Sequence, residues 1–156
     1  LLSVLNSSFH SYIVGQCTEA IILGTLCALG MALFGFPYAV MIGAVVGAMA
    51  LIPIAGAYVG GAVGFLLILT VSPLRALLFV VYLIILQQLE GNLIYPRVVG
   101  GSIGLPGLWV LAAVTVGGGV SGITGMLLGV PVTATVYKLL KNDLHRREQL
   151  PPPANS

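Results

Sequence analysis

The stretch QQLEGNLIYPRVVG, from Gln87 to Gly100, places two charged residues in a sequence that is otherwise almost entirely apolar. The two charged residues are Glu90 and Arg97. The stretch also contains residues that can open a helix, namely Gly91, Asn92 and Pro96. A charge inside a bilayer is costly, so ionisable residues at membrane depth are functional candidates. The sequence on either side decides whether this stretch lies in a membrane.

The composition indicates a polytopic membrane protein. Of the 156 residues, 58% are hydrophobic and only 6% are charged, whereas soluble domains carry roughly 25% charged residues. The 21 glycines do not recur at every third position as in collagen. The apolar runs are too long and too uniform for the alternating strands of a membrane barrel. We therefore predict an all-α fold, a polytopic transmembrane helical bundle with broken or re-entrant helices.

Three charge-free runs set the expected number of spans. They lie between Glu19 and Arg75, between Arg75 and Glu90, and between Arg97 and Lys138. A spanning helix needs about 20 apolar residues, so residues 1–140 are predicted to form a transmembrane helical domain of five to six spans. Residues 141–156 form a basic and then proline-rich tail, whose positive charges predict a cytoplasmic C-terminus.

The beginning of the chain has neither an initiating Met nor the pattern of a signal peptide. We expect a fragment that lacks an N-terminal part.

Proline and glycine interrupt the apolar runs. The sequence IPIAG, Ile52 to Gly56, should break a helix, and the short apolar pieces on either side are typical of a discontinuous or re-entrant helix. The glycine-rich run from Gly117 to Gly125 predicts a break or a close-packed crossing, and Pro131 predicts a kink. Glycines four residues apart, such as Gly43 and Gly47, allow helices to pack closely in lipid.

A polar cluster ends the apolar run that precedes the opening stretch. Four polar side chains fall within six residues, namely Gln87, Gln88, Glu90 and Asn92. If the segment stays helical, Gln87, Glu90 and Arg97 share one face. The cluster is either a polar contact that fixes helix packing, with Glu90 and Arg97 as a pair, or a binding site for a polar solute or ion. The composition does not separate these alternatives.

Glu19 also has two interpretations. The favoured one places its carboxylate at the headgroup level, where the charge costs little. In the other, Glu19 and Gln16, one turn apart on the same helix face, line an interior cavity. The nearby Cys17 and the more distant Cys27 would lie about 15 Å apart on one helix, so we expect both thiols to be reduced.

No catalytic constellation is visible. The two histidines, His10 and His145, are not part of any metal or nucleophile motif. The glycines at 117, 119 and 122 match a dinucleotide fingerprint in letters only, because that motif needs a preceding strand. An intramembrane enzyme would need a second polar cluster facing Glu90, which the sequence does not reveal. We therefore expect no enzyme, no cofactor, no metal site and no nucleic acid partner.

The opening stretch carries a family resemblance. The pattern E-G-N-x-I-x-P-R-V-V-G, residues 90–100, resembles the signature of the autoinducer-2 exporter family of bacterial membrane proteins. Three further motifs agree in the same order: F-P-Y at residues 36–38, L-I-P at 51–53 with Gly56 and Gly60, and L-P at 105–106 followed by Trp109 and a glycine cluster up to Pro131. The resemblance covers roughly Gly15 to Leu140.

The resemblance implies the C-terminal portion of a transporter in the bacterial inner (plasma) membrane. It implies export of a small polar solute such as autoinducer-2, with ion coupling and a role in quorum sensing. It also implies a homo-oligomer surrounded by lipid, since at least one family member is a pentamer. Some relatives behave as sodium(lithium)/proton antiporters, which is one alternative. A non-transporting membrane scaffold is another.

We expect the two broken segments, Ile52 to Gly56 and Glu90 to Gly100, to meet at mid-depth. The residues expected to bind the solute or ion are Gln87, Glu90, Asn92 and Arg97. The residues expected to line the site as helix breaks are Pro53, Gly56, Gly91 and Pro96. Arg97 would balance Glu90, because a lone buried carboxylate tends to take up a proton. This favours proton coupling through Glu90.

Overall fold

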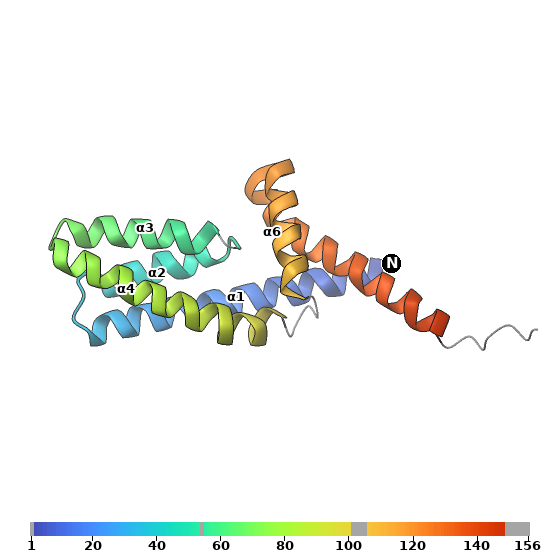
Figure 1. Cartoon of the computed structure of the whole chain (residues 1–156), viewed down its shortest axis with the longest axis horizontal. Helices are drawn as coiled ribbons and strands as arrows, with labels where there is room; N and C mark the ends of the chain where they lie inside the picture. Colours follow the sequence, from blue (N-terminus) through green and yellow to red (C-terminus); the bar gives the residue numbers. More distant parts are fainter. Residues whose placement is uncertain (1, 54, 101–105, 149–156) are drawn as a thin grey trace, which may run out of the picture.

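The computed structural model describes residues 2–53, 55–100 and 106–148, and within these ranges it is helical without strands (Figure 1). The helices in chain order are α1 (Leu2–Leu33), α2 (Ala39–Ala50), α3 (Ala55–Leu69), α4 (Pro73–Leu89), the π-helices η1 (Glu90–Ile94) and η2 (Pro96–Gly100), and α6 (Gly107–Glu148). The predicted all-α membrane bundle is confirmed. The proline-rich end of the expected tail, residues 149–156, lies outside the described residues.

Three helical stretches among the described residues are long and apolar enough, by length and composition, to cross a membrane: Leu5–Leu33, Pro73–Val99 and Leu108–Leu144, the last of which is divided by a sharp bend at Ser121 and Gly122. Helices α2 and α3 have only 12 and 15 residues, so they extend about 18 and 22 Å, less than a hydrocarbon core of about 30 Å. Counting apolar residues gives five to six spans because it does not separate such short helices from full spans. Large apolar side chains are exposed on the outer faces, as in Leu33, which is 85% exposed.

Helices α2 and α3 fold back on each other as an antiparallel hairpin against α1 (Figure 1). Gly56 lies so close to α2 that an added Cβ would run into the carbonyl oxygen of Met49. Gly43 and Gly47 contact the backbone of Gly24 in α1, which is the close packing that glycines permit. The predicted interruption near Pro53 is therefore present, and the two short helices form a hairpin.

Helix α1 connects two apolar clusters. Its C-terminal half packs with α2, α3 and α4 around buried side chains such as Leu23, Ile42 and Phe79. Its N-terminal half contacts α6 through Tyr12, which lies in a second cluster with Val130. Cys17 and Cys27 are both free.

Helix α4 begins at a capped end and does not break where we expected an opening. Ser72 is its N-cap and Pro73 its first residue. Beyond Leu89 the chain continues as wide π-helical turns, in which the N–H of Tyr95 donates to the carbonyl oxygen of Glu90, five residues earlier. Pro96 has no N–H, and its ring would clash with the preceding turn of an α-helix, so a wider turn accommodates it. π-helical turns are frequent at functional sites.

Helix α6 is itself a hairpin of two helices. Its direction changes at Ser121 and Gly122, where Gly122 has φ 59°, a conformation that suits glycine. Gly117 and Gly125 touch across the hairpin through their backbones. The predicted break in the glycine cluster is confirmed. Pro131, where we expected a kink, lies inside the second half of α6, and the sharp change of direction falls at Gly122 instead.

Candidate functional site

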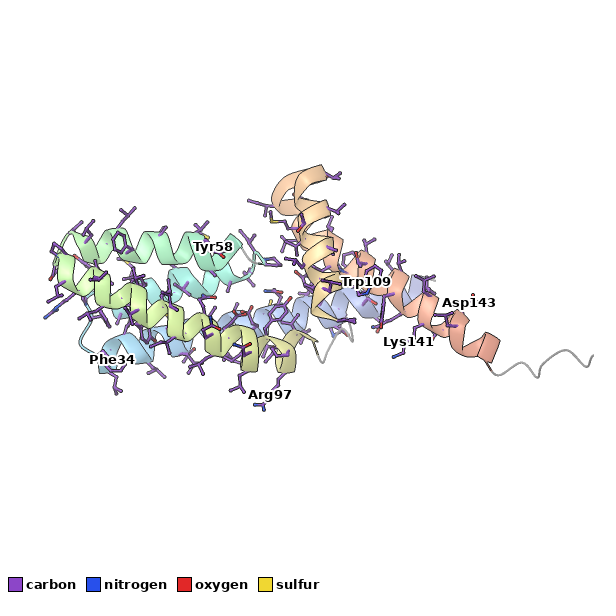
Figure 2. The ribbon with its side chains drawn as sticks, in the orientation of Figure 1. Phe34, Tyr58, Arg97, Trp109, Lys141 and Asp143 are labelled. Carbon is purple, nitrogen blue, oxygen red and sulfur yellow. The ribbon has the colours of Figure 1, made fainter. Side chains whose placement is uncertain are left out.

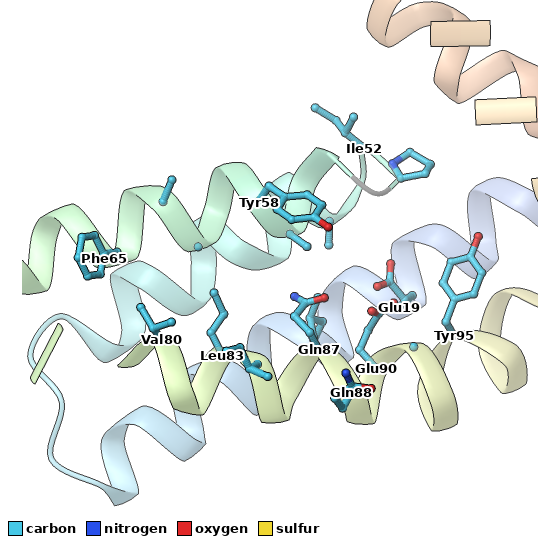
Figure 3. A pocket seen from close by; sticks show the side chains of 18 of the residues that line it. Glu19, Ile52, Tyr58, Phe65, Val80, Leu83, Gln87, Gln88, Glu90 and Tyr95 are labelled. Carbon is cyan, nitrogen blue, oxygen red and sulfur yellow. The ribbon is translucent and has the colours of Figure 1, made fainter. Parts of the chain in front are cut away.

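A cavity of about 710 Å³ lies between α1, the turn joining α2 to α3, the helices α3 and α4, and η1 (Figure 3). This volume falls within the range of small-molecule sites. One end is apolar and includes Phe65, Val80 and Leu83. The other end is lined by the polar side chains of Gln16, Glu19, Gln87, Gln88, Glu90 and Tyr95. The cavity can therefore hold a solute that has both polar and apolar surface.

Two carboxyl groups meet at the polar end. Glu19 of α1 is only 3% exposed, and Glu90 of η1 is half-buried. Their side chains point toward each other, and both line the cavity (Figure 3). Ionised carboxylates only accept hydrogen bonds, so a hydrogen bond between these two groups requires a proton on one of them. We call Glu19 and Glu90 the carboxyl pair.

Gln16 connects the carboxyl pair to the α2–α3 hairpin. Its Nε2 donates to Glu19 Oε2 at 3.0 Å and to the carbonyl oxygen of Ala50, the last residue of α2, at 2.8 Å. Its Oε1 is buried and has no partner within the described structure, and the same is true of Gln87 Nε2. Buried polar atoms are usually hydrogen-bonded. Gln16 and Gln87, which both line the cavity, therefore each carry a covered polar atom without a partner, an acceptor in Gln16 and a donor in Gln87.

The structure separates the predicted site residues into two groups. The residues that line the cavity are Pro53, Gln87, Glu90 and Gly91. The other four do not line it: Gly56 packs on α2, and Asn92, Pro96 and Arg97 are exposed. The two interrupted segments do meet at the cavity, as expected. Their depth in a membrane stays a prediction.

Asn92 makes local contacts outside the cavity. Its Nδ2 donates to the carbonyl oxygen of Gln88 at 2.9 Å and to Gln88 Oε1 at 3.1 Å. These bonds lie on the exposed side of the helix. Asn92 therefore orders the π-helical turn from outside and does not reach the cavity.

Arg97 does not form the expected pair with Glu90. Its side chain is exposed and points away from the bundle (Figure 2), and no ion pair joins the two residues, both of which lie in the described part of the chain. Seven residues bring two side chains to one face of an α-helix. The π-helical turns bond to the fifth residue and hold more residues per turn, so Arg97 is rotated off that face. The group that faces Glu90 is Glu19.

The favoured interpretation of Glu19 is wrong, and its alternative is confirmed. Glu19 lies inside the protein with Gln16 and lines the cavity. The spacing of these two residues on one helix was the available signal. Tyr58 and Tyr95 also line the cavity, and no sequence pattern had singled them out.

A second polar cluster thus faces Glu90. It consists of carboxyl and amide groups, and no group of three or more metal-ligating side chains occurs among residues 2–53, 55–100 and 106–148.

These features define a class, a multi-pass helical membrane protein in which interrupted helices enclose a polar cavity. Interrupted helices around a buried polar site are typical of proteins that move solutes across membranes. The chain belongs to the family described as AI-2E family transporter, whose model matches residues 1–144. The resemblance of the opening stretch is therefore confirmed.

Curated relatives agree with this membership. The chain is 32% identical over 145 residues to YrrI and 33% identical over 138 residues to YueF, each named "Putative transport protein" in Bacillus subtilis (strain 168). It is 33% identical over 140 residues to sll0063 of Synechocystis, which carries the same description. These alignments cover 93%, 88% and 87% of this chain but only 41%, 37% and 34% of the relatives. No solved structure matches the chain.

Proposed function

We propose that this protein exports a small polar solute such as autoinducer-2 through the cavity between α1, the α2–α3 hairpin and η1. The observation that carries the proposal is the polar end of the cavity, where the unpaired Gln16 Oε1 and Gln87 Nε2 lie beside the carboxyl pair. Both atoms are covered in the structure, and rotation of the two amide groups toward the cavity would let a hydroxylated solute give them the partners that buried polar groups require. Export of this solute would give the protein a role in quorum sensing.

Transport is coupled to protons through Glu90 in this proposal. The carboxyl faces the cavity, and none of the cavity-lining residues in the described part of the chain is a Lys, Arg or His. A carboxyl group without a cationic partner in a low-dielectric site is the kind of group that takes up and releases a proton. The proton and the solute would therefore compete for the same polar end.

The proposed location is the bacterial inner membrane with the C-terminus in the cytoplasm. Lys138 and Lys141 lie near the end of the last long apolar helix, where basic residues favour the cytoplasmic side. The proposed assembly is a homo-oligomer, a pentamer by family resemblance. The large exposed apolar side chains, such as Val40 and Val120, are available to lipid or to neighbouring copies.

The test is uptake and efflux of labelled autoinducer-2 in vesicles that contain the full-length protein. Proton and sodium gradients are imposed separately, and empty vesicles are the control. We expect movement of the label that is driven by the proton gradient. Transport at the rate of empty vesicles under every gradient would contradict the proposal.

A sodium(lithium)/proton antiporter is the second candidate. The carboxyl pair, Gln16 Oε1 and the carbonyl oxygen of Ala50 place several oxygen atoms together, and hard cations prefer oxygen ligands. This candidate predicts proton movement when sodium or lithium is added to vesicles without any organic solute. The exporter predicts none under that condition.

The remaining alternatives are a scaffold and an enzyme. A non-transporting scaffold predicts that Glu90→Gln and Arg97→Ala change oligomer size on a sizing column as much as they change transport. An intramembrane enzyme now has the second polar cluster that it requires. It predicts chemical conversion of the solute, which mass analysis of the transported label would detect. The relatives described as transport proteins favour the non-enzymatic function.

A further inference from the structure

The carboxyl pair joins two elements that are far apart in sequence. Glu19 belongs to α1, and Glu90 begins η1. Two ionised carboxylates in hydrogen-bond contact repel each other strongly and offer no donor between them. One proton shared by the pair converts this repulsion into a hydrogen bond. Two carboxyl groups that face each other in one cavity are therefore suited to hold one proton between them.

Among the described residues that line the cavity around the pair, none has a cationic side chain that could replace the proton. The titratable groups that face the pair or line the cavity are Tyr12 of α1, Tyr95 after η1 and Tyr58 of α3. Helix α2 contributes the carbonyl oxygen of Ala50. Arg97 is exposed on the outside, and Lys138 of α6 donates to Ser8 on α1. The described groups around the pair are thus carboxyls, amides and phenols.

The local geometry connects the pair to its neighbours. Gln16 holds Glu19 and the end of α2 at the same time through its Nε2. On the other side, a Cβ added at Gly91 would have no atom within 4 Å, so η1 has free space directly after Glu90. The pair therefore joins a carboxyl that Gln16 holds on α1 to a carboxyl at the start of η1, beside the open space at Gly91.

We propose that Glu19 and Glu90 form a single proton-binding site in which one shared proton holds η1 against α1. Loss of the proton leaves two carboxylates that repel each other, so η1 separates from α1 and the polar end of the cavity opens. Glu19 is thereby an equal partner of Glu90, and Gln16 is a positioning residue that holds the Glu19 carboxyl in place. That this site is used in export rests on the proposed function. That the carboxyl pair holds one proton does not depend on the proposed function.

The test is infrared spectroscopy of the purified full-length protein in liposomes, titrated with acid and base. Difference spectra against Glu19→Gln/Glu90→Gln isolate the pair from other carboxyl groups. We expect a protonated-carboxyl band at neutral pH in the wild type. The band should be lost at a lower pH in Glu19→Gln and in Glu90→Gln than in the wild type, because the new amide donates to the remaining carboxylate and stabilises its charged form. Thr18→Ala, an exposed neighbour on α1, is the matched control and should keep the band.

The outcomes are decisive in both directions. A wild-type spectrum with no protonated carboxyl at neutral pH overturns the proposal, and this result needs no folded variant. A band that is lost at the wild-type pH in both single variants also overturns the shared site. Glu19→Asp keeps a carboxyl at this position and should keep a band, at a shifted frequency. If the protonated-carboxyl band is present but the vesicles transport no autoinducer-2, the proposed function is wrong and the proton site is still supported.

Discussion

The two helical hairpins of this chain are built alike but differ in what their turns contact. In both, glycines let the backbones touch, at Gly56 beside α2 and at Gly117 beside Gly125. The α2–α3 turn lies beside Gln16 and the carboxyl pair, and it lines the cavity. The turn of α6 is exposed and projects away from the other helices (Figure 1). An interrupted apolar helix therefore becomes part of a site only where a neighbouring helix supplies polar side chains.

The largest expected effect is on stability and comes from adding a side chain at Gly56, where α2 and α3 are in close contact. Gly56→Ala adds a Cβ that runs into the carbonyl oxygen of Met49, and such overpacking costs about 1–3 kcal/mol. The matched change in the other hairpin is Gly119→Ala, where a Cβ meets no atom within 4 Å. There the replacement should be neutral or stabilising by up to about 1 kcal/mol.

Reversible unfolding in detergent measures both free energies. Equal effects of the two replacements would contradict the close packing of the α2–α3 hairpin. The comparison is strict because the same methyl group is added in each case.

The second effect is on the rate of export and concerns Glu19, whose carboxyl was expected at the headgroup level from the sequence. In Glu19→Gln the amide donates to Glu90 without a proton, so the pair stays closed at every pH. We expect proton-driven export to fall about tenfold, a change of about 1.4 kcal/mol in the barrier. Thr115→Val on α6 removes an exposed hydroxyl that bonds to Leu111 and should leave export unchanged. Equal rates for Glu19→Gln and the wild type would restore the surface interpretation.

The next effect is on stability and on the infrared band, and it is expected at Gln16. Gln16→Ala removes the bonds to Glu19 and to the carbonyl oxygen of Ala50, which together should reduce stability by about 1–2 kcal/mol. The infrared band of the carboxyl pair should shift, since the Glu19 carboxyl loses its donor. If stability falls but the band keeps its frequency, Gln16 has a packing role only.

The smallest effect is expected at Arg97. Its side chain is exposed and makes no ion pair with Glu90 within the described structure. Surface replacements usually change stability by less than about 0.5 kcal/mol, so Arg97→Gln should leave both stability and the pH profile of export near the wild type. A pH profile like that of Glu90→Gln would mean that the two residues form a pair after all.

The helical class, the interruption near Pro53 and the break in the glycine cluster could all be predicted from the sequence. Composition and the positions of proline and glycine determine these features locally. The partner of Glu90 could not be predicted in the same way. Residue spacing assumed α-helical turns and indicated Arg97, whereas the π-helical turns rotate Arg97 off that face, and the group that faces Glu90 is Glu19, 71 positions earlier in the chain. Pairing between distant helices depends on packing, which spacing along one helix does not contain.

The most direct test of the central claim is the pH dependence of autoinducer-2 efflux from vesicles containing the full-length protein or its Glu90→Gln variant. Wild-type efflux should change with pH as the carboxyl pair gains and loses its proton. The variant should be slower and should show no such dependence. If Glu90→Gln keeps both the wild-type rate and the wild-type pH dependence, the carboxyl pair does not couple protons to export.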